Sequence, residues 1–235
     1  MNFFLRAVLF DCDGIIADSE EWWNEIDREH LAFFGVPDYR GQYKAQVIGK
    51  SLILSDSFYR DTFGIAASVE EMVEQRVSVA AKFYGEKIPP FDGAREVLGE
   101  LHARGLPLAL ATSSVGRLIR PFLERHDLAR FFSCVVTGEQ VQNGKPHPDI
   151  YLKAAQGVET APESCLVVED ALAGLQSGRS AGCATVAIPD ARWLDVQEFE
   201  GKSDYLLGSL RELPALVERL LSGEASGRAA RRELE

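Results

Sequence analysis

The stretch LRAVLFDCDGIIADSE, residues 5–20, decides the fold. Its apolar run ends at Asp11, and Asp13 follows after a single cysteine. A short, nearly continuous apolar run is typical of a strand covered on both faces of a parallel sheet. Residues directly after such a strand lie at the carboxyl edge of the sheet, where parallel α/β folds bind their ligands. The stretch therefore predicts a buried first strand that ends at a polar site.

Similar apolar runs recur along the chain, and helical patterns separate them. The predicted strands are residues 5–10, 106–112, 134–138, 165–170 and 184–189, with a possible sixth near Tyr205. The patterns at 94–104 and 171–181 have the spacing of helices packed on a core. Alternating strands and helices predict an α/β class with a doubly wound, Rossmann-like parallel sheet.

One connection is too long for a simple crossover. A strand–helix–strand unit needs about 30 residues, but the first two predicted strands are separated by 95 residues (106 − 10 − 1). The excess has helical patterns, and Ser68 with Glu71 forms the sequence signature of a capping box. We expect an all-helical cap domain over 17–92, inserted into a core of 1–16 and 93–221. The polar tail, 222–235, is expected to fray.

Composition limits the partners. The 235-residue chain has a formal net charge of −11, which disfavours nucleic acid and anionic membranes but leaves room for a small anionic substrate. No apolar run is long enough to span a bilayer, and the start lacks a secretion signal, so we expect a cytoplasmic protein. The four cysteines are far apart and form no C-x-x-C pair, which predicts buried, reduced thiols. No protein partner is indicated.

Chemically active side chains follow four predicted strands. They are Asp11 and Asp13, then Thr112, Ser113 and Ser114, then Lys145, and then Glu169 and Asp170. Each group alone is compatible with a loop, a turn or a helix cap, so the prediction rests on their conjunction at one edge. Crowded carboxylates require a counter-charge, and Mg²⁺ suits carboxylates, waters and a substrate phosphate. The hydroxyls and the lysine would supply donors for phosphate oxygens.

Four segments carry a specific resemblance. They are FDCDGIIADSE (10–20), LALATSS (108–114), GKPHPDIY (144–151) and VVEDALAGLQSGRSAG (167–182). In order and spacing they resemble the four motifs of the haloacid dehalogenase superfamily, in its phosphatase and β-phosphoglucomutase-like branch, which has a helical cap. The resemblance implies a Mg²⁺-dependent phosphatase that acts on a small phosphorylated metabolite, such as a sugar phosphate, through an aspartyl-phosphate intermediate.

The resemblance also implies roles for individual residues. Asp11 would be the nucleophile and Asp13 the general acid and base. Thr112, Ser113 and Lys145 would bind the phosphate. Mg²⁺ would be held by the Asp11 carboxylate, the Asp13 backbone carbonyl, Glu169 and Asp170. In the cap, the residues expected to contact substrate are Ser19, Glu20, Trp23 and Lys50.

Other branches of the superfamily differ at identifiable positions. The dehalogenating branch lacks an acid at Asp13, so phosphoryl transfer is favoured here. The phosphonate-cleaving branch uses a cap lysine, and the surroundings of Lys44 and Lys50 do not match it well. The mutase pattern has a histidine where this chain has Trp23. That departure favours a phosphatase and leaves a phosphosugar mutase as the alternative. A catalytically idle binding module would typically have lost an acid or the lysine, and none is lost.

Cys12 lies between Asp11 and Asp13 in the opening stretch. Neighbouring carboxylates raise the pKa of a thiol and suppress its thiolate, so a cysteine nucleophile is disfavoured. Alternation turns Cys12 away from the side that Asp11 and Asp13 share. We expect Cys12 to be a small apolar spacer packed beneath the site.

Overall fold

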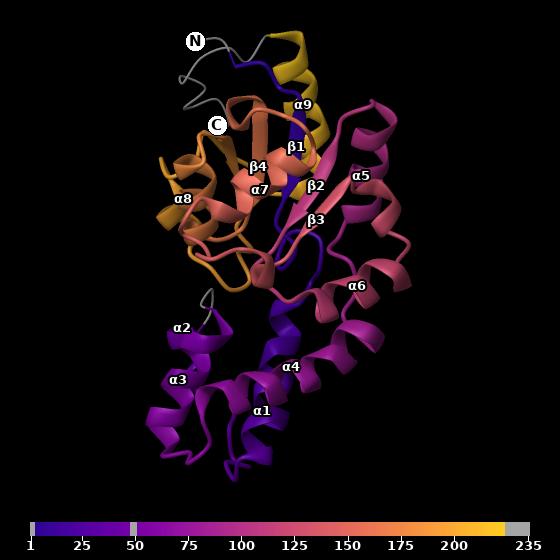
Figure 1. The fold of residues 1–235 in the computed structure, drawn as a ribbon. Helices are drawn as coiled ribbons and strands as arrows, with labels where there is room; N and C mark the ends of the chain where they lie inside the picture. Colours follow the sequence, from indigo (N-terminus) through magenta and orange to yellow (C-terminus); the bar gives the residue numbers. More distant parts are fainter. Residues whose placement is uncertain (1–2, 48–50, 224–235) are drawn as a thin grey trace.

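The computed structural model describes residues 3–47 and 51–223, and its centre is a parallel sheet (Figure 1). The strands run in the order β3-β2-β1-β4-β5-β6, and all paired neighbours are parallel. Their bounds are β1 Ala7–Phe10, β2 Leu108–Ala111, β3 Cys134–Val136, β4 Cys165–Glu169, β5 Ala184–Ala187 and β6 Tyr205–Leu206. The predicted parallel α/β sheet is confirmed, including the sixth strand. The order reverses between β1 and β4, which makes their carboxyl ends the expected ligand site.

Helices cover both faces of the sheet (Figure 1). They are α5 Ala94–Ala103, α6 Gly116–Arg125, α7 Asp149–Gly157, α8 Leu172–Ser180 and α9 Leu213–Ser222. Short 3₁₀ turns lie at Ala129–Phe131, Gly138–Gln140, Pro162–Ser164, Val196–Phe199 and Leu210–Glu212. Alternate residues of β1 enter two apolar clusters: Val8 packs in the cluster with α5, α6 and α9, and Leu9 in the cluster with α7. Burial on both faces explains why the strand lacks polar alternation.

Four further helices form a layer apart from the sheet (Figure 1). They are α1 Glu20–Phe33, α2 Lys44–Val47, α3 Leu52–Phe63 and α4 Val69–Glu86, and we call them the helical insertion. The insertion has an apolar cluster of its own, which includes Leu31, Tyr59 and Met72. The predicted capping box begins α4, since Ser68 and Glu71 each bond the backbone of the other. An inserted helical cap is therefore present, while the exact domain boundaries stay a prediction.

Two chain crossings join the insertion to the core. The Asp18 amide donates to the Pro89 carbonyl at 3.0 Å, and the Phe91 amide donates to the Ile16 carbonyl at 2.8 Å. The two linkers thus pair like a short piece of sheet. In addition, α4 packs along α6. The fixed pairing of the linkers sets where the insertion lies over the carboxyl edge of the sheet.

Two further sequence predictions concern membrane-spanning helices and the C-terminal tail. Within residues 3–47 and 51–223, no helix has both the length and the apolar character needed to cross a bilayer. Helix α9 ends at Ser222, and most of the predicted tail lies outside the described residues.

Candidate active site

The carboxyl ends of β1 and β4 bring the candidate acids together. The Asp11 amide continues the strand pairing by donating to the Val168 carbonyl at 3.0 Å. Glu169 is the last residue of β4, and Asp170 follows it. Adjacent parallel strands end at the same edge, so acids separated by more than 150 residues meet.

A tight turn follows Asp11. The Cys12 carbonyl accepts the amides of Ile15, Ile16 and Ala17 at 3.3, 2.8 and 2.8 Å, so the chain folds back within a few residues. Gly14 has φ +81°, and a Cβ there would lie 2.0 Å from Asp170 Oδ2. A larger residue would therefore face both backbone strain and a clash with a candidate metal ligand.

Cys12 is fully buried within the main apolar cluster, as expected. Burial, followed by the charges of Asp13 and Asp11, raises the pKa of its thiol well above the usual range. Cys12 is thus a packed, protonated thiol between two acids of the site.

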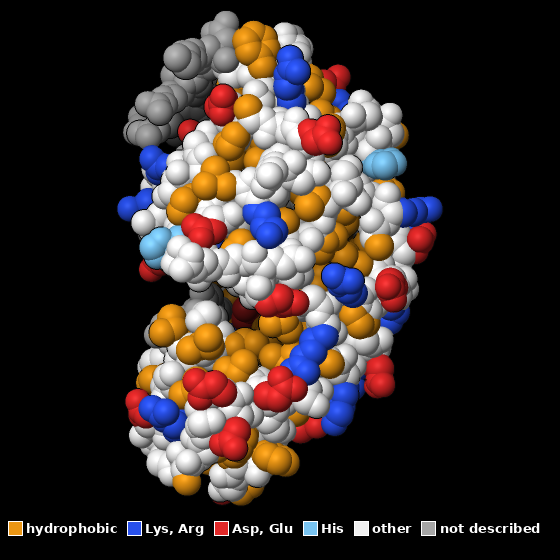
Figure 2. Space-filling view, viewed as in Figure 1, with side chains coloured by type: hydrophobic (Ala, Val, Ile, Leu, Met, Phe, Trp, Pro, Cys, Tyr) orange, Lys and Arg blue, Asp and Glu red, His pale blue; other side chains and the backbone are white. Residues whose placement is uncertain are grey.

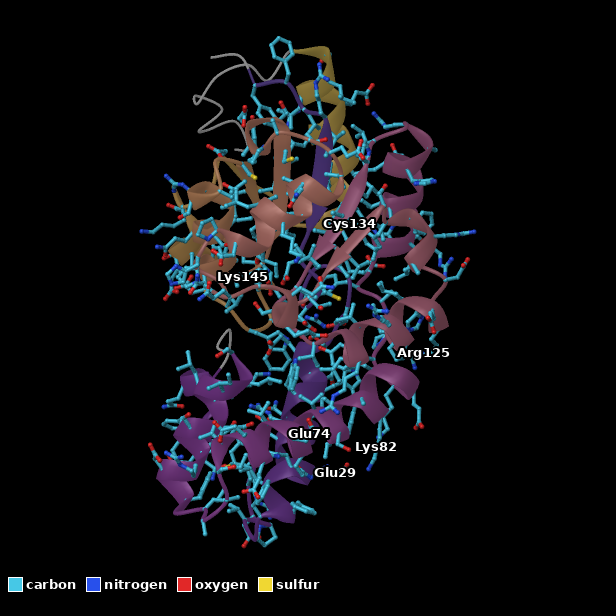
Figure 3. All side chains as sticks on the ribbon, in the orientation of Figure 1. Glu29, Glu74, Lys82, Arg125, Cys134 and Lys145 are labelled. Atoms are coloured by element: carbon cyan, nitrogen blue, oxygen red, sulfur yellow. The ribbon has the colours of Figure 1, made fainter. Side chains whose placement is uncertain are left out.

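Lys145 contacts two of the candidate acids, and Figure 3 shows it in the part of the core nearer to the insertion. Its Nζ is 2.7 Å from Asp11 Oδ1 and 2.6 Å from Glu169 Oε1. Ligand atoms of Asp11, Glu169 and Asp170 all lie within 4.8 Å of one another. Tyr151 also donates to Glu169 Oε1 at 2.6 Å, which fixes that carboxylate from behind. These side chains are almost completely buried, so the charges interact strongly.

The cluster holds more negative charge than one lysine balances. Burial is the main cause that raises the pKa of Asp11 from 3.8 to about 7, and Lys145 opposes the rise. Burial and the neighbouring acids raise the pKa of Asp170 well above its usual range. Three carboxylates with one ammonium carry a charge of −2 when all are ionised, which a divalent cation would neutralise. The all-oxygen donor set is the kind that Mg²⁺ prefers, so the residues fit that ion.

Asp13 is held separately, by hydroxyl groups. Its Oδ1 accepts from Ser19 Oγ at 2.7 Å and from the Tyr84 hydroxyl, and its Oδ2 accepts from Ser114 Oγ at 2.7 Å and from Thr112 Oγ1 at 3.5 Å. Ser19 and Tyr84 belong to the linker and the insertion, whereas the other two donors belong to the core. Burial raises the pKa of Tyr84 well above its usual range, so it remains a donor. The Asp13 side chain thus joins the core to the insertion.

The phosphate-binding candidates occupy the turn after β2. Thr112 is buried, and its Oγ1 also accepts the Ser114 amide at 3.0 Å. Ser113 is exposed at the same edge. The turn therefore places the hydroxyls of Thr112 and Ser114 against Asp13 and leaves Ser113 exposed to solvent.

The cap residues that were expected to contact substrate have different surroundings. Ser19 is completely buried against Asp13, which makes it a partner of the acid in this structure. Glu20 is half-buried: burial raises the pKa of its carboxyl, and Lys44 at 3.5 Å opposes the rise. Trp23 is half-buried and packs edge-on against Tyr84 with 6.2 Å between ring centroids. Lys50 lies outside the described residues.

Sequence reasoning did not identify Tyr84 and Tyr151, and it gave Ser114 only as one of the hydroxyls that could donate to phosphate, not as a partner of Asp13. Tyr151 belongs to the GKPHPDIY segment, so its position in that motif was a usable signal. Tyr84 follows Asp13 by 71 residues, and its contact depends on how α4 packs against the core. Figure 2 shows the surface hollowed between the core and the insertion, with acidic side chains at the opening.

Comparison with known proteins agrees with this geometry. Residues 8–188 match the family model described as haloacid dehalogenase-like hydrolase. The chain belongs to this family. It is 31% identical over 178 residues to "Phosphorylated carbohydrates phosphatase" of Thermotoga maritima, covering 76% of this chain and 82% of the relative. It is 28% identical to "Hexitol phosphatase B" of Escherichia coli K12, covering 90% and 95%.

Solved structures show the same fold in this haloacid dehalogenase-like family. A Thermotoga maritima protein, provisionally assigned as a beta-phosphoglucomutase, has TM-score 0.74 and 27% identity, covering 92% of this chain and 99% of that one. CbbY from Rhodobacter sphaeroides, solved in complex with phosphate, has TM-score 0.76 and 24% identity, covering 89% and 96%. The relatives therefore include both phosphatases and mutase-like proteins.

Proposed function

We propose that this chain is a Mg²⁺-dependent phosphatase that acts on a small phosphorylated metabolite, most simply a sugar phosphate. The observation that carries the proposal is the buried contact of Lys145 with Asp11 and Glu169, beside Asp170. Burying a lysine with three acids contributes little to folding stability, because removing the charges from water is costly. The same charges suit the binding and transfer of a phosphoryl group. The named phosphatase relatives support the same activity.

The proposed chemistry follows from the two separate carboxylates. Asp11 Oδ attacks phosphorus, the ester P–O bond breaks, and Asp13 gives a proton to the leaving oxygen. Asp13 then takes a proton from water, which attacks the aspartyl phosphate and releases inorganic phosphate and free Asp11. Thr112 Oγ1, the Ser113 amide and Lys145 hold phosphate oxygens during both steps.

Mg²⁺ would be held by the Asp11 carboxylate, the Asp13 backbone carbonyl, Glu169 and Asp170, and it would stabilise charge on the transferring group. The hydrogen bonds of Asp13 to Ser19 and Tyr84 link its role as general acid to the position of the insertion. Because Ser19 and Tyr84 hold Oδ1, the position of the insertion controls the orientation of the acid. We propose that binding of substrate between insertion and core redirects this carboxylate toward the leaving oxygen.

Substrate selection is assigned to the insertion. Glu20, Trp23 and Lys50 are proposed to contact the part of the substrate beyond the phosphate, and Ser19 is proposed to act there mainly through Asp13. A half-buried tryptophan beside Tyr84 offers an apolar wall with one N–H donor. Such a surface suits the carbon skeleton of a polyol or sugar.

A phosphosugar mutase is the second candidate, because the Thermotoga maritima neighbour with that provisional assignment covers almost the whole chain. Trp23 in place of the mutase histidine argues against it. ³¹P NMR separates the two activities: a phosphatase releases inorganic phosphate from β-glucose 1-phosphate. A mutase would instead form glucose 6-phosphate in a reaction that requires a bisphosphate primer.

The activity is tested with p-nitrophenyl phosphate in Mg²⁺ and in EDTA. We expect turnover in Mg²⁺ only, and we expect Asp11→Asn to abolish it. Asp61→Asn is the matched control, because the Asp61 side chain is 71% exposed on the insertion. Wild-type turnover by Asp11→Asn would exclude the mechanism. A panel of phosphorylated metabolites then identifies the substrate.

Two sequence predictions accompany the proposal. The cytoplasmic location and the lack of nucleic acid, membrane and protein partners stay predictions. Fractionation of cells that express the tagged chain tests the location.

A further inference from the structure

Cys165 and Cys183 face each other at the amino ends of two neighbouring strands. Leu166 of β4 pairs in register with Ala184 of β5, so the residues one position earlier, Cys165 and Cys183, are also opposite one another. Both side chains belong to the same apolar cluster, on the face covered by α7. They therefore leave the sheet on the same side.

The spacing of these neighbours suits a covalent bond between their sulfurs. Neighbouring strands lie about 4.8 Å apart. Disulfides join Cα atoms that are about 4.4–6.8 Å apart. Cys183 also directly follows Gly182, an exposed glycine at φ +89°, in the turn that enters β5. The turn gives one end of the pair local freedom to adjust.

The two thiols influence each other's protonation. The position of each thiol beside the other lowers the pKa of Cys165 and raises the pKa of Cys183. The Cys165 thiol also contacts the Ala161 carbonyl, with 3.5 Å between sulfur and oxygen. Cys165 is thus the better nucleophile of the pair, and Cys183 is placed to react with it.

The other two cysteines lack this arrangement. Cys12 is buried between acids that raise its pKa. Cys134 belongs to β3, and β2 and β1 separate it from β4. Burial also raises the pKa of Cys134. Neither residue is therefore expected to compete for the same bond.

We propose that Cys165 and Cys183 form a reversible disulfide when hydrogen peroxide oxidises the protein. The Cys165 sulfur attacks one peroxide oxygen, the O–O bond breaks, and Cys165 sulfenic acid and water form. The Cys183 sulfur then attacks the sulfenic sulfur, the S–O bond breaks, and a second water leaves. Two thiols and one H₂O₂ give one disulfide and two waters. A dithiol reverses the step by exchange.

Burial of both sulfurs slows their reaction with an oxidant. Cys165 is completely buried and Cys183 is 6% exposed, so the oxidant reaches the sulfurs when the Gly182 turn opens. In a reducing compartment the pair stays as two thiols, as expected from the sequence. The structure records all four cysteines as free.

The test uses the full chain, reduced and then exposed to hydrogen peroxide in EDTA. We expect the intact mass to fall by about 2 Da and the thiols titrated after unfolding to fall from four to two. Peptide mapping without reduction should find a Cys165–Cys183 peptide, and dithiothreitol should restore the thiols. The oxidised chain should also melt about 5 °C higher or more, because the bond closes a loop in the unfolded chain.

Variants separate this bond from other oxidation. Cys183→Ala should lose the 2 Da change, and Cys134→Ala should keep it. The peptide map of the wild type shows which two cysteines are joined, so this result does not depend on how well a variant folds. A mass gain of about 16 or 32 Da without a cross-link, or a cross-link that includes Cys12 or Cys134, would overturn the proposal.

Discussion

Replacing the candidate nucleophile should stabilise the metal-free protein. In the folded chain the pKa of Asp11 is about 7, compared with 3.8 for the ordinary group, mainly because the carboxyl is buried. The difference is about 3 pKa units, or about 4 kcal/mol for ionising Asp11 in the folded state. Asp11→Asn keeps the shape of the side chain, removes the charge, and leaves Lys145 paired with Glu169.

The direction of the pH dependence follows from proton binding. Between about pH 4 and pH 7 the folded chain keeps a proton on Asp11 that the unfolded chain has released. The free energy of unfolding therefore falls as the pH rises through this window. Asparagine does not titrate, so the variant lacks this part of the slope. Asp170 remains in both proteins, but the Asp11 charge helps to raise the pKa of Asp170, so the difference between the curves reports Asp11 together with its effect on Asp170.

The assay is urea unfolding in EDTA at pH 4.5 and pH 8. We expect Asp11→Asn to exceed the wild type by up to about 4 kcal/mol at pH 8 and by much less at pH 4.5. Mg²⁺ should stabilise the wild type more than the variant. Asp61→Asn, at an exposed position, should change neither curve. Equal stability of Asp11→Asn and wild type at pH 8 would refute the reasoning about buried charge.

Two further substitutions test how the site is positioned. Gly14→Ala should lower turnover about 100-fold and weaken Mg²⁺ binding, because its Cβ would meet the Asp170 carboxylate at 2.0 Å; Gly35→Ala has the same kind of φ with no described atom within 4 Å, and should lose only stability. Tyr84→Phe should lower turnover about tenfold by removing a hydroxyl from Asp13. Steady-state kinetics and Mg²⁺ titration check both, and unchanged turnover would contradict either role.

The sheet and the acid cluster could be predicted because each depends on local patterns and one topological rule. Apolar runs identified the strands, although the run at 106–112 forms a strand only over Leu108–Ala111, where both neighbours pair with it. Parallel order then places Asp11, Glu169 and Asp170 at one edge without knowledge of side-chain contacts.

The contacts of Asp13 could not be predicted in the same way. Tyr84 reaches Asp13 because α4 lies along α6 and because the paired linkers fix the distance between α4 and the sheet. Neither fact follows from periodicity, since a helix pattern gives a buried face without naming its partner. The proximity of Cys165 to Cys183 likewise depends on the register of β4 and β5, which the sequence does not specify.

The acids and the thiol pair lie at opposite ends of β4, and this separation has a testable consequence. From Cys165 to Glu169 the strand rises over four residues, about 13 Å. Effects on stability at such a distance usually add, because the sites share no contacts. Oxidised Asp11→Asn should therefore gain the sum of the two separate stabilisations in EDTA at pH 8, measured by urea unfolding. A shortfall or excess above about 0.5 kcal/mol would mean that locking the start of β4 changes the acid cluster at its end.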